Sequence, residues 1–279
     1  MTLGLVPSDA GLLCLQAGVV AMPRALPPAA LVELRRFRGR GWALVPVGSI
    51  VLVILAIRYA SATADWLTWL ALIAVPLLSV AALGWLMHGA RRWWALAVPA
   101  LFLLAWRLPG ALVGEGAAAL LSGLSCVSLG VLLGAVTPPR WLKLGILAMA
   151  GADVWLIATQ TLQVPNNVLV AAAPGGGLPQ LQSELFGSVS LGYGDLFVAG
   201  LLGALWSGRP SGQWRLALVT LALAAVFDVV FDLAHNELPA TVPVALALLV
   251  GEAWRAWQVS RDGRGDRMAP RLSSVDRCA

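Results

Sequence analysis

Charged residues are scarce in this chain. They make up 12% of its 279 residues, whereas soluble domains carry about 25%. Hydrophobic residues reach 59%, and no stretch is both polar and long enough to fold as a separate soluble domain. This composition excludes an ordinary soluble protein and indicates a single membrane-embedded unit with short tails.

Histidine and cysteine are nearly absent as well. The chain has two histidines, His88 and His235, and three widely separated cysteines, Cys14, Cys126 and Cys278. It contains no HExxH motif of a zinc peptidase and no GxSG-type serine motif. The cysteine spacing fits neither a metal site nor a disulfide framework. We therefore expect no metal and no organic cofactor.

Long apolar runs fill most of the sequence. A bilayer core takes roughly 20 apolar residues per helix, so a chain of this length allows about eight or nine spans. Helices are expected, because each span in lipid must satisfy its own backbone groups. The clear runs lie at about 42–60, 66–87, 93–107, 110–136, 141–162, 186–206, 214–231 and 238–257. The sequence thus predicts an all-α polytopic membrane protein.

A further apolar run, at residues 10–22, has no lysine or arginine before it, so it is not a standard signal peptide. It could form a short first span or an interfacial segment. With this run as a span there are nine helices, and without it there are eight.

Basic residues alternate between the connections. They cluster before the first clear run, in every second connection after it and in the C-terminal tail. The clusters are Arg35, Arg36, Arg38, Arg40, Arg91, Arg92, Arg140, Lys143, Arg209 and Arg215, with Arg261, Arg264, Arg267, Arg271 and Arg277 in the tail. This alternation predicts a multi-pass protein of the cell membrane with its C-terminus in the cytoplasm. Topology then explains the net charge of +5, and no nucleic-acid partner is expected.

These features divide the chain into four parts. They are an N-terminal segment at 1–40, a first helical bundle at 41–140, a second group of helices at 141–257, and a cytoplasmic tail at 258–279 that is expected to be disordered.

Two aspartates lie inside predicted spans, Asp153 in the run 141–162 and Asp195 in the run 186–206. A carboxylate at bilayer depth is costly, so it is a candidate functional residue by default. Each is nine residues from the end of its run that faces the 163–185 connection, a distance of about 14 Å in a helix. Two antiparallel helices would therefore bring both carboxylates to one level, where they could share a proton.

Three short motifs accompany the aspartates. Gly192-Tyr193-Gly194-Asp195 is a GxGD pattern, in which glycine permits a departure from helical geometry. Pro239 and Pro243 at the start of the last run could leave carbonyls free for a ligand's backbone, although proline is also common in the first turn of an ordinary helix. The run 168–173, bounded by Pro165 and Pro174, is typical of a strand or a re-entrant piece, or of a loop in the interface.

Together, the aspartate in one span, GxGD in the next and Pro-Ala at the start of the last resemble the GxGD intramembrane aspartyl proteases. This is the presenilin and signal peptide peptidase family, here in a prokaryotic-type form, and the resemblance covers residues 145–250. It implies a presenilin-like bundle with Asp153 and Asp195 as the catalytic pair. It also implies substrate contacts at Gly192, Tyr193, Gly194, Leu238, Pro239, Ala240, Val168, Leu169 and Val170.

The resemblance also implies a partner. The predicted orientation is that of signal peptide peptidase, so substrates would be transmembrane helices or signal peptides with a cytoplasmic N-terminus, drawn from the lipid bilayer. The chain departs from the family at Ala152, where tyrosine is usual, and at Thr241, where leucine is usual. The oligomeric state is left open.

Two alternatives remain at this point, and a third is disfavoured. A proton-coupled transporter would use membrane carboxylates as relays, and Asp228, Asp232, Glu115 and Glu252 add acids near span ends. An inactive homologue could bind membrane helices, for example through a Gly130–Gly134 pair. A type 4 prepilin peptidase would be expected to carry a basic residue soon after GxGD, whereas Leu196 and Phe197 follow here.

Overall fold

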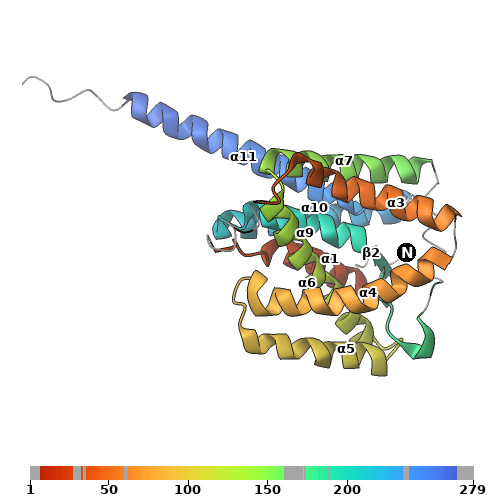
Figure 1. Ribbon diagram of the computed structural model, residues 1–279. Helices are drawn as coiled ribbons and strands as arrows, with labels where there is room; N and C mark the ends of the chain where they lie inside the picture. The colour runs from red at the N-terminus through yellow and green to blue at the C-terminus, as the bar shows by residue number, and fades with distance from the viewer. Residues whose placement is uncertain are drawn as a thin grey trace, which may run out of the picture.

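The computed structural model describes residues 7–27, 33, 36–59, 62–159, 172, 174–181, 183–187, 189–234 and 239–268 (Figure 1). These residues form a bundle of helices together with one small sheet. The helices are α1 (Pro7–Ala21), α3 (Val45–Tyr59), α4 (Ala62–Ala81), α5 (Ala97–Arg107), α6 (Leu112–Val136), α7 (Pro139–Ala158), α9 (Tyr193–Trp206), α10 (Pro210–Ala234) and α11 (Thr241–Met268). A π-helical turn at Ala82–Leu86 extends α4, and a 3-10 turn at Arg92–Leu96 precedes α5.

Among the described helices, four are long and apolar enough to cross a membrane. They cover Asp65–Leu86, Leu112–Val136, Pro139–Ala158 and Pro210–Val230. Two shorter apolar helices lie at Ser8–Ala21 and Tyr193–Trp206. The chain is therefore a predominantly helical protein of membrane-embedded character, and each predicted run contains a helix. Several of these helices are shorter than their runs, since α5 has 11 residues and α9 has 14.

The bundle has two distinct ends. At the end that we call the aspartate end, α7 ends while α9 and α11 begin. At the opposite end, which we call the arginine end, short connections join α6 to α7 and α9 to α10, and α11 projects beyond its neighbours (Figure 1). Arg140, in the first turn of α7, and Arg209, between α9 and α10, lie at this end.

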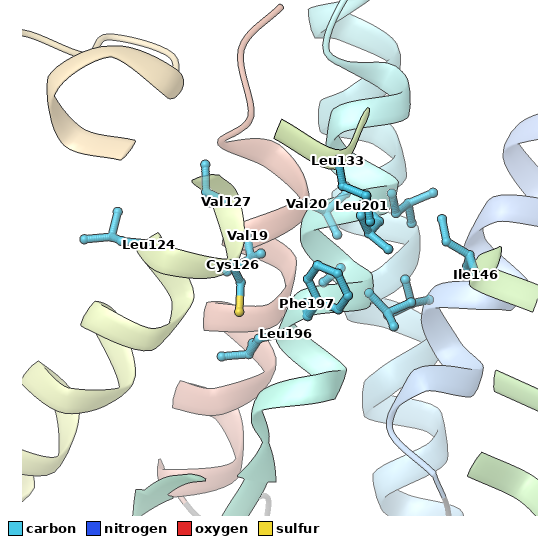
Figure 2. Close-up of a cluster of buried hydrophobic side chains, with 14 of the residues drawn as sticks. Val19, Val20, Leu124, Cys126, Val127, Leu133, Ile146, Leu196, Phe197 and Leu201 are labelled. Atoms are coloured by element: carbon cyan, nitrogen blue, oxygen red, sulfur yellow. The ribbon is translucent and has the colours of Figure 1, made fainter. Parts of the chain in front are cut away.

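The core lies where α6, α9 and α1 cross (Figure 2). Its fully buried side chains include Val20 of α1, Cys126 of α6 and Leu201 of α9. Glycine allows the helix backbones to approach closely. A Cβ added at Gly200 of α9 would lie 2.3 Å from the Cys126 carbonyl oxygen, and one added at Gly130 of α6 would lie 2.3 Å from the Gly200 carbonyl oxygen. Small residues at such crossings are typical of helix packing in membranes.

The structure settles the form of the apolar run at 10–22. It forms α1, which packs against α6, α9 and α10 inside the bundle. Gly203 of α9 abuts its backbone, because a Cβ at that glycine would lie 2.4 Å from the carbonyl oxygen of Val20. The segment is therefore a buried element of the bundle.

The expectation of a continuous helix over residues 186–206 is wrong. The run 186–206 is not helical from its start: strands β1 (Ser183–Phe186) and β2 (Val189–Gly192) pair in antiparallel fashion, with Ser183 opposite Gly192. The turn between the strands uses Gly187 at φ +65°, a backbone conformation that favours glycine. The helical bundle thus carries one short hairpin, and α9 begins only at Tyr193.

The expectation of a disordered tail from residue 258 is wrong for its first part. Helix α11 continues from the apolar segment through the charged one as far as Met268. Residues 258–268 contain no proline, which would end the helix, although Gly263 and Gly265 in this stretch are poor helix formers.

Candidate active site

Asp153 is held by the first residue of α11. It lies in α7, five residues before the end of that helix, and its side chain is 9% exposed. The hydroxyl group of Thr241 donates a hydrogen bond of 2.7 Å to Oδ2 of Asp153. Thr241 is fully buried, so this bond fixes one carboxylate oxygen in a dry environment.

Asp195 occupies the first turn of α9. The chain is extended at Gly192 and becomes helical at Tyr193, so Asp195 is the third helical residue. The N–H of Gly192 donates a hydrogen bond of 3.1 Å to Oδ2 of Asp195. An acidic side chain at this position also stabilises a helix N-terminus by ordinary capping. Its side chain is partly exposed.

The two aspartates come together at the aspartate end. Helices α7, α9 and α11 pack against one another in pairs, and Gly194, beside Asp195, faces Met149, which lies one turn before Asp153 in α7, so the two aspartates lie at close range. Two carboxylates at such a range in a poorly solvated site repel each other when both are ionised. The structure therefore joins the aspartate of α7, the GxGD segment and the start of α11 in one place.

Tyr193 anchors α9 to α6. Its hydroxyl lies 2.7 Å from the hydroxyl of Ser125, which in turn donates to the carbonyl of Ser122. Tyr193, which we expected to contact substrate, thus uses its hydroxyl group in a hydrogen bond between two helices. Of the two glycines beside it, Gly192 is the more constrained, because a Cβ there would lie 3.0 Å from Oδ2 of Asp195, whereas one at Gly194 would lie 3.5 Å from the Met149 methyl group.

Of the two interpretations of the Pro-Ala segment, the structure favours an ordinary helix start over free carbonyls at residues 239 and 240. The carbonyl of Pro239 accepts a hydrogen bond from the N–H of Val242 at 3.1 Å. The carbonyl of Ala240 accepts one from Nε2 of Gln16 at 3.0 Å. Sequence reasoning missed Gln16, whose one signal is that it is a polar residue within an apolar run.

Several expected contacts lie outside the described residues. These are Leu238, Val168, Leu169 and Val170. Their relation to the aspartates therefore stays a prediction.

Two of the acids considered as proton relays have partners of their own. Glu115 accepts a hydrogen bond of 2.7 Å from the N–H of Gly187, which ties α6 to the hairpin turn. Glu252 pairs with Lys143 at 2.5 Å and with Arg255 at 3.1 Å at the arginine end. Within the described ranges, no three His, Cys, Asp or Glu side chains form a group that could hold a metal ion.

Comparison of the chain with protein-family models, curated proteins and solved structures gave no match.

Proposed function

We propose that the protein is an intramembrane aspartyl protease that hydrolyses peptide bonds within transmembrane segments. The observation that carries the proposal is the convergence of Asp153, Asp195 and Thr241 from three helices at one end of the bundle. The GxGD and Pro-Ala motifs occupy this same place. Two carboxyl groups that share a proton can supply both the general base and the general acid for hydrolysis of an amide.

The reaction uses both carboxylates and one water. The two acids share a proton, since both cannot ionise at close range at low cost. The ionised carboxylate takes a proton from water, whose oxygen attacks the scissile carbonyl carbon. The protonated carboxyl group donates to the carbonyl oxygen, and a proton then passes to the leaving nitrogen as the C–N bond breaks. The pair acts as one unit, so neither residue has a fixed acid or base role.

The substrate helix must unwind to expose a peptide bond. Strand β2 leads directly into Asp195, so an extended substrate added alongside this hairpin would pass close to the dyad. Main-chain hydrogen bonds would supply affinity without a strict sequence requirement. Backbone pairing at the hairpin is the mode of recognition that we propose.

The topology follows from the loop charges. We place the arginine end in the cytoplasm and the aspartate end toward the outside, which favours substrates with a cytoplasmic N-terminus. The packing of α1 inside the bundle favours nine spans over eight. The protein would then reside in the cell membrane, with its C-terminus in the cytoplasm.

The test is cleavage of a panel of single-span substrates by the purified full chain in liposomes. Asp153→Asn and Asp195→Asn each keep the side-chain volume, and Asp228→Asn in α10 is the matched control. We expect cleavage within the span, lost in both dyad variants and kept in the control. Cleavage that survives both dyad substitutions would refute the proposal, and proton flux without cleavage would favour a transporter.

A further inference from the structure

A buried amide on α1 reaches the start of α11. Gln16 is 1% exposed, in a helix whose other residues are mostly apolar. Its Nε2 donates to the carbonyl of Ala240 at 3.0 Å, across 224 positions of sequence. An amide buried in an apolar bundle is costly unless it is hydrogen-bonded, so this contact fixes which face of α1 is turned toward Ala240, the residue before α11.

The residue bound by Gln16 adjoins the residue that holds Asp153. Ala240 immediately precedes Thr241, whose hydroxyl donates to Asp153. The backbone here has few internal constraints: Pro243 has no N–H to give to the carbonyl of Pro239, which takes the N–H of Val242 instead. The peptide unit between Ala240 and Thr241 therefore accepts a hydrogen bond from α1, and the Thr241 hydroxyl next to it orients Asp153 of α7.

Helix α1 also packs against the helix that carries the second aspartate, at the arginine end of that helix. There, Gly203 of α9 lies against the carbonyl of Val20. The same helix thus contacts the helix of Asp195 and the turn that holds Asp153.

We propose that Gln16 is a positioning residue of the dyad. It fixes the turn at residues 239–241, and through Thr241 it sets the orientation of Asp153 toward Asp195. This inference rests on the proposed protease function. Gln16 itself touches no substrate.

The chain offers a matched control in Gln213 of α10. Gln213 is fully buried, and its Nε2 donates to the carbonyls of Val20 and Pro23, both at 2.9 Å. It is the same residue type with the same kind of bond to a distant backbone. Its contacts lie at the arginine end, away from the aspartates.

The experiment compares Gln16→Met with Gln213→Met in the full chain in liposomes. Methionine keeps length and volume but cannot donate. Small misplacement of a catalytic group can cost up to about 100-fold in rate, so we expect kcat per folded molecule to fall by about 10- to 100-fold in Gln16→Met, with KM unchanged. Gln213→Met should keep the wild-type kcat even where it lowers stability.

Amide hydrogen exchange of the non-proline residues between 240 and 248 gives a second readout that needs no catalysis. Exchange there should be faster in Gln16→Met and unchanged in Gln213→Met. Equal kcat values for the two variants, or unchanged exchange in Gln16→Met, would overturn the positioning role. If the wild-type protein cleaves nothing, the protease proposal fails, and the exchange comparison alone decides whether Gln16 holds the turn.

Discussion

Lys143 and Glu252 form an ion pair, with Nζ 2.5 Å from Oε2, that joins α7 to α11. Lys143 lies ten residues before Asp153, and Glu252 lies eleven residues after Thr241. Because the two helices are antiparallel, the ion pair and the Thr241–Asp153 hydrogen bond fasten them at two levels about 15 Å apart. Helix α7 is thereby fixed to α11 at both the arginine end and the aspartate end.

The ion pair should contribute modestly to stability. Its side chains are partly exposed, at 26% and 32%, so we expect Lys143→Met to lower the free energy of unfolding by about 0.5–1 kcal/mol. Glu252→Gln should cost more, because Glu252 also pairs with Arg255. A double-mutant cycle in detergent would measure the coupling, and zero coupling would show that the two-level attachment does not contribute.

The hydroxyl of Thr241 should matter for turnover. Thr241→Val keeps the shape but removes the donor to Asp153. A hydrogen bond to a charged group is worth about 1.5–3 kcal/mol, so we expect at least about a tenfold loss of kcat. Thr241→Ser, which retains a hydroxyl, should keep most activity. Wild-type turnover in Thr241→Val would show that this bond has no part in the reaction.

The crossing of α6 and α9 should not tolerate a side chain at Gly200. A Cβ there meets the Cys126 carbonyl oxygen at 2.3 Å, and neither backbone can give way cheaply. We expect Gly200→Ala to destabilise the protein by about 1–3 kcal/mol. Gly151→Ala is the control, because Gly151 lies in α7 with open space around it. Thermal unfolding in detergent compares them, and equal midpoints would contradict the close crossing.

Hydropathy was sufficient to predict that helices exist, because apolar runs of this length have few other solutions in lipid. It failed at residues 186–192, which carry no charge and so joined the predicted span, although Gly187, Ser188, Ser190 and Gly192 make up four of these seven residues. The strands are encoded by alternation in Val189-Ser190-Leu191 and by the turn at Gly187, a signal of only a few residues. The depth argument for Asp195 is therefore wrong in its premise, since Asp195 is the third residue of α9.

The sequence predicted the candidate site only where the type of side chain is unusual for its surroundings. Asp153 and Asp195 stand out because carboxylates are rare in apolar runs. The support from Gln16 was not predictable, since its partner is a backbone carbonyl 224 positions away and backbone atoms leave no mark in sequence. The same holds for the bond between Glu115 and the N–H of Gly187.

The two glycines of GxGD should differ in their tolerance of substitution. A Cβ at Gly192 would lie 3.0 Å from Oδ2 of Asp195, while one at Gly194 would make an ordinary contact of 3.5 Å with the flexible Met149 side chain. Gly192→Ala should therefore push the Asp195 carboxylate away from the Gly192 N–H that holds it, and lower kcat by about tenfold or more. Gly194→Ala should retain most activity. The measurement is kcat per folded molecule for both variants in liposomes. An equal loss in the two would mean that the motif's glycines serve the incoming substrate rather than the rotamer of Asp195, because only Gly192 stands against that carboxylate.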